Sequence, residues 1–152
     1  MPLSPPPQAR NEPVWMSIAR AELGVRETPG KRSTPRVQTY FGATVAGDKT
    51  NDDVPWCSAF VNWVMAQAGF RGTRRLAARS WEHWGVASPA RTGAIVVLWR
   101  ESPESTKGHV GFLVSEAADT VTLLGGNQSN MVSIRTFPKV RVLTMRWPQM
   151  GV

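Results

Sequence analysis

The sequence predicts an α+β fold in which N-terminal helices pack on a five-stranded antiparallel sheet. Apolar residues recur with helical spacing in the first half of the chain and with a period of two from Gly93 onward. Helices followed by a run of strands favour an antiparallel sheet over the alternating order of a parallel one. The length of 152 residues suits one domain, and the chain has no internal repeat. We therefore expect a flexible arm at residues 1–12 and a single domain over residues 13–150.

The arm is predicted from composition, because the residues up to Pro13 are rich in proline and contain no apolar run. The same feature argues against a secretory signal peptide, which needs an apolar core. The longest apolar stretch, Ala94–Trp99, is too short to span a bilayer. We expect a protein made in the cytoplasm with no transmembrane segment, which would act elsewhere only after release or delivery by another system.

Two short helices are expected before residue 42. Apolar spacing predicts the first over Pro13–Leu23, and Gly24 is suited to end it. The second is predicted from about Thr34 to Phe41, with Pro35 in its first turn. A loop rich in glycine, aspartate and asparagine follows.

The third helix has the clearest signals. Asp52 or Asp53 can cap it, Pro55 suits its first turn, and Gly69 suits its end. One face of this helix is apolar and consists of Cys57, Phe60, Val61, Val64 and Ala68. Cys57 is therefore expected at the N-terminal end of the helix, on the side that packs inward.

The strands are expected after an irregular connection over Arg71–Ala90. Segments with a period of two, separated by turn residues, are Gly93–Trp99, His109–Ser115, Thr120–Leu124, Met131–Phe137 and Val140–Trp147. The turn between the second and third of these strands is predicted at Glu116–Asp119.

The charge of the chain favours anionic partners. Eighteen basic and eleven acidic side chains leave a net charge of +7, which favours nucleic acid, an acidic membrane surface or a carboxylate-rich cell wall. The basic residues form no single helix or arm, and the chain has no zinc-finger spacing, RNA-recognition signature or phosphate-binding loop. We expect no specific nucleic-acid partner, although a basic nucleic-acid-binding protein stays open as an alternative.

Cys57 is the only cysteine, so it cannot form an intramolecular disulfide. One cysteine and two histidines also make a poor zinc site. The roles that remain for Cys57 are catalysis and inert packing in the core. A helix N-terminus and a neighbouring imidazole would lower the pKa of the thiol, whereas burial would raise it. Catalysis therefore requires Cys57 to lie at the edge of the core, open to a cleft.

His109 and Asn127 can complete such a site only in one strand register. If residue 109 lies opposite residue 127, the two side chains share a face, and Asn127 can orient the ring of His109. If the register slips by one residue, Asn127 points away, although a bulge at Gly125–Gly126 could correct this. His83, in a tryptophan-rich loop, is the rival base. We favour His109 because a strand holds its side chain better than an irregular loop does.

Three segments together resemble a known family. Residues 55–61 (PWCSAFV), 108–111 (GHVG) and 125–128 (GGNQ) resemble the CHAP branch of the NlpC-like cysteine hydrolases. These are papain-like peptidoglycan amidases and endopeptidases, common in phage lysins and secreted antibacterial effectors. The likeness covers about residues 12–148 and implies a papain-like core.

The resemblance also implies roles for individual residues. Cys57 matches the nucleophile, His109 the base, and Asn127 a polar partner on the next strand. The chain departs from the family at Gly125, where many members carry glutamate, and at Trp56, where many carry glutamine. The oxyanion donors are therefore not assigned beyond the Cys57 backbone N–H.

Calcium and cofactors are not expected. Some relatives bind calcium upstream of the cysteine, but the acidic and amide residues there lack EF-hand spacing. Those residues are Asp48, Asn51, Asp52 and Asp53. Helix capping is the expected role of this cluster, and no metal or organic cofactor is expected.

The expected function is a cysteine-dependent peptidoglycan hydrolase, either an N-acetylmuramoyl-L-alanine amidase or a peptide endopeptidase, acting as a lysin or antibacterial effector. Its expected substrate is the peptide stem, its candidate protein partners are an immunity protein or a holin-type release partner, and it is expected to be a monomer. A non-catalytic wall- or protein-binding module on the same scaffold is the main alternative.

Overall fold

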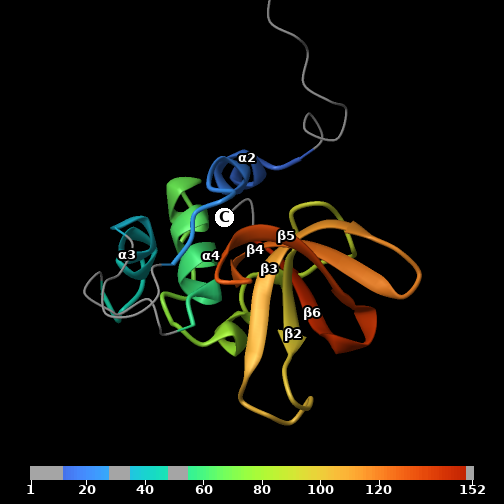
Figure 1. The fold of residues 1–152 in the computed structure, drawn as a ribbon. Helices are drawn as coiled ribbons and strands as arrows, with labels where there is room; N and C mark the ends of the chain where they lie inside the picture. The colour runs from blue at the N-terminus through green and yellow to red at the C-terminus, as the bar shows by residue number, and fades with distance from the viewer. Residues whose placement is uncertain (1–11, 28–34, 48–54, 150–152) are drawn as a thin grey trace, which may run out of the picture.

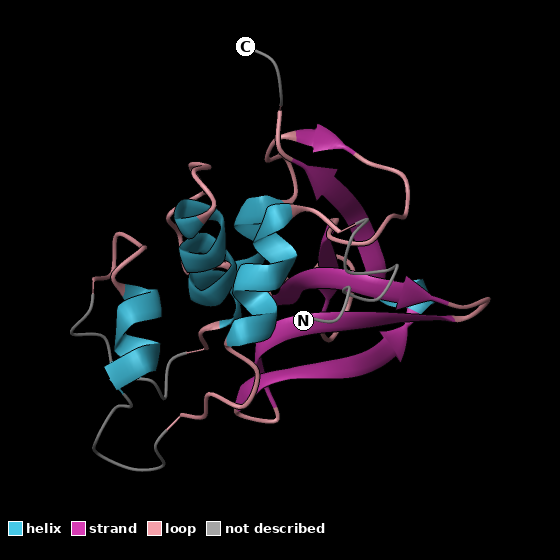
Figure 2. Ribbon diagram, turned by 90° about the horizontal axis from the view of Figure 1, so that it is seen from above, coloured by secondary structure: helices cyan, strands magenta, loops and turns pink. Residues whose placement is uncertain are grey.

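The computed structural model describes residues 12–27, 35–47 and 55–149, in which helices lie on one side of a six-stranded antiparallel sheet (Figures 1 and 2). The helices are α2 (Val14–Ala21), α3 (Pro35–Phe41) and α4 (Cys57–Gln67), with short 3-10 helices η1 (Ala78–Trp81) and η2 (Lys139–Arg141). The strands are β1 (Val86–Ala87), β2 (Ile95–Trp99), β3 (Gly108–Glu116), β4 (Thr120–Gln128), β5 (Met131–Pro138) and β6 (Val142–Trp147). They lie in the order β1-β6-β2-β3-β4-β5. The predicted α+β class is confirmed.

The predicted strand count of five was one too low. The additional strand, β1, lies in the segment expected to be irregular and pairs only with β6, where Val86 is opposite Trp147. Two residues are too few to show a period of two, so the sequence carries no local signal for this strand. The edge position of β1 leaves the rest of the predicted sheet unchanged.

Helix α4 is buried on every side over Cys57–Met65, although the sequence predicts only one apolar face. Helices α2 and α3 cover it on one side and strands β3 and β4 on the other. The predicted end at Gly69 is confirmed, because that residue adopts a φ of 90°, which glycine tolerates. Pro55 precedes the helix instead of lying in its first turn, and the N-cap is Trp56, whose side chain makes no capping bond. The predicted caps, Asp52 and Asp53, lie outside the described residues.

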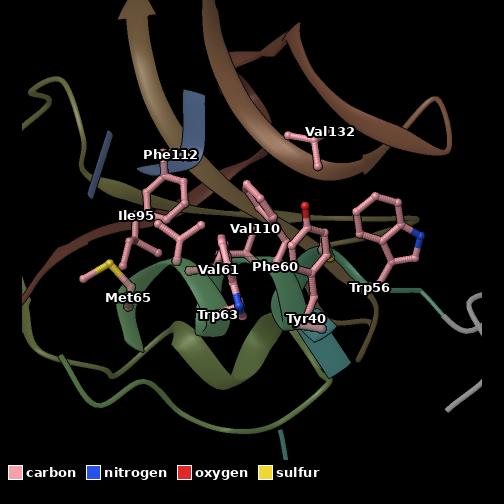
Figure 3. Packing of buried hydrophobic residues seen from close by; sticks show 14 of the residues in the cluster. Tyr40, Trp56, Phe60, Val61, Trp63, Met65, Ile95, Val110, Phe112 and Val132 are labelled. Carbon is pink, nitrogen blue, oxygen red and sulfur yellow. The ribbon is translucent and has the colours of Figure 1, made fainter. Parts of the chain in front are cut away.

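The main core lies between α4 and the sheet. Figure 3 shows side chains of α4, including Val61 and Met65, against Ile95 of β2 and Phe112 of β3. A second apolar cluster, containing Val96 and Leu98, covers the opposite face of the sheet. Because β2 is buried on both faces, its sequence is a continuous apolar run. This packing holds the N-terminal end of α4 next to the beginning of β3.

The two ends of the described fold meet through aromatic side chains. Trp15 of α2 packs edge-on against Trp147 of β6, with ring centroids 4.9 Å apart. The indole N–H of Trp15 also donates a hydrogen bond to the carbonyl of Gly93 at 2.9 Å. Helix α2 is therefore attached to both the last strand and the segment that leads into β2.

A buried carboxylate joins α2 to α3. Glu22 lies 2.5 Å from Arg36, and the Tyr40 hydroxyl donates a hydrogen bond to the same carboxylate at 2.7 Å. The hydrogen bond from Arg36 lowers the pKa of Glu22 against the opposing effect of burial. The guanidinium of Arg36 also lies 4.9 Å from the ring of Trp63 on α4. This group of side chains connects the three helices.

Candidate active site

Cys57 is the first residue of α4 and is 5% exposed. Burial by itself raises the pKa of the thiol, but the hydrogen bond from His109 and the charge of that ring lower it by more. The backbone N–H groups of Val110 and Ser58 also donate to the sulfur and lower the pKa further. The net effect is a thiol that ionises more readily than an ordinary cysteine.

His109 is the second residue of β3 and lies opposite Leu98 of β2. Burial lowers the pKa of the imidazole, but the hydrogen bond and the negative charge of Cys57 raise it by more. The ring of Phe137 packs beside the imidazole, with centroids 5.3 Å apart. The lowered pKa of the thiol and the raised pKa of the imidazole both favour a thiolate–imidazolium pair, which titrates as one unit.

Gln128 holds the other side of the imidazole. Its Oε1 lies 2.8 Å from Nε2 of His109. The side-chain NH₂ of Gln128 donates to the carbonyls of Leu123 and Ser133, at 3.2 and 2.8 Å. These bonds orient the amide so that its oxygen faces the ring, and Nε2 of His109 must then carry the proton and donate. The remaining ring nitrogen, Nδ1, is left to face the thiol.

Asn127 lines the same cavity as Cys57 and His109. Within the described part of the chain, however, no side-chain hydrogen bond joins Asn127 to His109; the bond expected from Asn127 is made by Gln128. Strands β3 and β4 pair in the register that was expected to favour the site, because Phe112 lies opposite Leu124 and the same register would continue to residues 109 and 127. The pairing of β4 with β5 then shifts between Gly125 and Gln128, and Asn127 adopts a φ of 59°. This bulge turns the side chain of Gln128 toward the ring.

Two glycines permit these contacts. A Cβ atom at Gly125 would lie 2.5 Å from Oε1 of Gln128, so any side chain there would occupy the place of the Gln128 amide. A Cβ atom at Gly126 would lie 2.7 Å from Cβ of Phe60 and 2.8 Å from the ring of Trp56. Glycine therefore lets Gln128 enter the site and lets β4 lie directly against the beginning of α4.

Trp56 is fully buried and cannot act as an oxyanion donor. Its indole N–H donates to Glu27 at 3.0 Å, and its ring stacks on Tyr40. The backbone N–H of Cys57, at the first position of α4, lies beyond the reach of any intrahelical acceptor. It remains the candidate oxyanion donor.

Two cavities meet at Cys57. The first, which we call the basic cavity, has a volume of about 340 Å³ and is lined by Cys57, His109, Arg100, Arg135 and Arg141 among others. The second, which we call the small-residue cavity, has a volume of about 220 Å³. Its lining includes Cys57, Leu76, Ala77, Ala78 and Gly108. Arg100 borders both cavities. The rival base His83 is exposed and lines neither of them.

The wall of the small-residue cavity is attached to α4 by buried polar groups. The hydroxyl of Ser58 donates to the carbonyl of Arg75 at 2.6 Å and accepts the indole N–H of Trp81 at 2.9 Å. The side-chain oxygen of Asn62 accepts the backbone N–H of Arg74 at 2.7 Å. These bonds place the segment from residue 76 to 78 beside the thiol.

The described residues contain no group of three or more His, Cys, Asp or Glu side chains arranged to hold a metal ion. The upstream group of Asp48, Asn51, Asp52 and Asp53 lies outside them. In the same described ranges, every helix is too short or too polar to cross a bilayer.

Comparison with known families gives one match. The family model described as CHAP domain matches residues 49–127, a range that contains α4 and β3. The match includes Cys57, His109 and Asn127 and ends one residue before Gln128. No curated protein matches the chain.

Proposed function

Because the chain belongs to the CHAP domain family, we propose that it is a cysteine-dependent peptidoglycan hydrolase that cleaves an amide bond of the wall peptide. The family suggests a hydrolase of the amidase or peptidase type. The observation that carries the proposal is the buried, hydrogen-bonded pair of Cys57 and His109 at the junction of two cavities. A cysteine that served only packing would need neither the imidazole nor the open space.

In the first step, the thiolate of Cys57 attacks the carbonyl carbon of the amide. The backbone N–H of Cys57 supports the negative charge that develops on the carbonyl oxygen. As the carbon–nitrogen bond breaks, His109 gives its proton to the leaving amine. The product of this step is a thioester between Cys57 and the acyl half of the substrate.

In the second step, water attacks the thioester carbon and transfers a proton to His109. The carbon–sulfur bond breaks, the acid is released, and the thiolate–imidazolium pair forms again. We assign the orientation of His109 to Gln128, on the strength of the hydrogen bond between them. Asn127, the residue expected from the sequence, is proposed as part of the cavity wall.

We further propose that the protein acts on peptide stems in the cell envelope as a lysin or antibacterial effector. The net charge of +7 would keep it close to anionic wall polymers. This attraction should weaken as salt concentration rises. The fragments that the enzyme releases will distinguish cleavage of the sugar–peptide amide from cleavage of a peptide bond.

The proposal is tested by a zymogram on purified cell walls, followed by mass spectrometry of the released fragments. Wild-type protein should clear the wall, and Cys57→Ala should abolish clearing without unfolding the protein, because both side chains are small. His109→Ala should lower the rate by at least about 10²-fold, as expected for the loss of a general base. The matched control is His83→Ala, which should retain most activity. Clearing by Cys57→Ala within about tenfold of wild type would refute thiol catalysis.

A further inference from the structure

The described residues that line the basic cavity carry a net positive charge. Among the described residues, Arg100, Arg135 and Arg141 line it, and no acidic side chain does. Within residues 12–27, 35–47 and 55–149, none of these arginines forms an ion pair. Other arginines of the described chain do form ion pairs, as Arg36 does with Glu22.

The arginines also act on one another and on the site. Burial lowers the pKa of Arg141, and the positive charge of Arg100 lowers it further. The charge of Arg141 in turn opposes protonation of His109 and so lowers the pKa of that ring, although other contacts outweigh it. Arg141 is held in place, because its Nε donates to the carbonyl of Trp99 at 3.0 Å and its guanidinium lies 5.6 Å from the ring of Phe137. A bound anion would offset this repulsion.

The position of His109 indicates which half of the substrate lies in the basic cavity and carries the anion. His109 must reach the leaving amine in order to protonate it, and His109 lines the basic cavity but not the small-residue cavity. The amine half of the substrate therefore lies in the basic cavity. The acyl half extends to the other side of Cys57, where the small apolar lining of Leu76, Ala77 and Ala78 suits a short apolar group.

A further cation among the described residues of the small-residue cavity, Lys107, does not change this assignment. Lys107 lines that cavity, but its ammonium group is exposed and lies 2.9 Å from the carboxylate of Glu101, which offsets its charge. Guanidinium groups are suited to carboxylates, which they bind through two parallel hydrogen bonds. A cavity of about 340 Å³ fits one amino-acid residue with its carboxylate better than a length of polymer.

We propose that the basic cavity binds a free carboxylate on the amine half of the cleaved amide, and that the small-residue cavity receives a short apolar side chain of the acyl half. This inference rests on the proposed function and adds a substrate class to it. The preferred bond joins a small apolar acyl residue to an amine-bearing residue with a free carboxylate. Amidation of that carboxylate would remove the charge that the arginines recognise.

The test compares soluble disaccharide–peptide fragments of peptidoglycan with the same fragments after conversion of their carboxylates to primary amides. For wild-type protein, kcat/KM on the free acids should exceed that on the amides by about tenfold or more, the effect of one charge-assisted hydrogen bond. Arg141→Gln and the more exposed Arg135→Gln should each reduce this ratio. Arg74→Gln is the control, since it removes an equal charge from a separate cavity and should leave the ratio unchanged. A ratio near one for the wild type would overturn the proposal.

A binding experiment separates this inference from the proposed hydrolysis. Calorimetry with Cys57→Ala should show about tenfold tighter binding of the free acids than of the amides. If wild-type protein cleaves neither form but this difference in binding remains, hydrolysis is refuted and carboxylate recognition stands. Equal binding of the two forms would overturn the recognition even where cleavage is observed. Displacement of the free acid by an equal concentration of a short single-stranded oligonucleotide would also overturn it, in favour of general attraction to polyanions.

Discussion

The contact between Gln128 and His109 gives a prediction with two opposing parts. Gln128→Ala removes a hydrogen bond to an imidazole that is charged in the active pair. Such bonds contribute about 1.5–3 kcal/mol. Part of this is present before the reaction begins, so we expect a fall of about tenfold in kcat, toward the lower end of the range. The pKa of His109 should also fall, because the Gln128 bond raises it.

The second part is a rescue. A Cβ atom at Gly125 would lie 2.5 Å from Oε1 of Gln128 but 3.5 Å from Nε2 of His109. In wild-type protein, Gly125→Ser should therefore lower activity by displacing the Gln128 amide. In the Gln128→Ala background the space is empty, and a serine hydroxyl at position 125 can reach Nε2. The same substitution should then restore part of the lost activity.

The assay is kcat against pH on one soluble wall fragment, for the two single variants and the double variant. Thermal unfolding is measured alongside, because Gln128→Ala also removes the hydrogen bonds that the Gln128 amide donates to the carbonyls of Leu123 and Ser133. Asn127→Ala is the control and should lower kcat less than Gln128→Ala does. If Asn127→Ala costs more, and Gly125→Ser lowers the activity of Gln128→Ala further, Gln128 is not the group that orients His109.

The remaining predictions concern the ion pair, the glycine contact and the buried carboxylate. Activity should be highest at pH values between the lowered pKa of Cys57 and the raised pKa of His109. His109→Ala should raise the pKa of the thiol and so slow its alkylation by iodoacetamide at neutral pH. An unchanged alkylation rate would contradict the pairing. Gly126→Ala should lower both melting temperature and activity, since it forces β4 away from α4, and unchanged values for both would disprove the close contact. Glu22→Gln should lower the free energy of unfolding by about 1–2 kcal/mol at neutral pH. This is less than the loss of a fully buried ion pair would cost, because Arg36 is half exposed. The pKa of Glu22 is lowered in the folded state, so this contribution is present above its unfolded pKa and is lost as pH falls through the folded value; urea unfolding at neutral and acid pH should show the difference disappear in acid.

Much of the fold follows from local patterns in the sequence, and the exceptions have physical causes. The period of the apolar residues placed the three helices and most of the strands within a few residues. Strand β4 continues to Gln128, beyond its predicted end at Leu124, because Gly125 still pairs with Ser133 and Gln128 with Met131 across a bulge. Glycines, which lack side chains, gave no strand signal there. Helix α4 is buried all round, which one chain segment cannot reveal because the burial depends on which elements cover it.

The candidate site was only partly accessible from the sequence. The family resemblance singled out Cys57 and His109, and chemistry required them to meet. The choice between Asn127 and Gln128 depends on where the bulge in β4 lies, and a shift of one residue reverses which side chain faces the ring. The arginines of the basic cavity could not be found by spacing at all, because Arg100 follows β2, Arg135 lies in β5 and Arg141 lies in η2. Only the folded sheet brings them together.

The position of β6 has a consequence for synthesis on the ribosome. Although β6 is the last strand of the sheet in sequence, it lies between β1 and β2, and Trp147 at its end contacts Trp15 of the first described helix. Cys57, His109 and Gln128 are therefore all translated while one edge of β2 still lacks its neighbour. An open strand edge of this kind can pair with other chains. The nascent protein should thus remain vulnerable to aggregation, and its site incompletely supported, until residue 147 has left the exit tunnel and the final strand can insert.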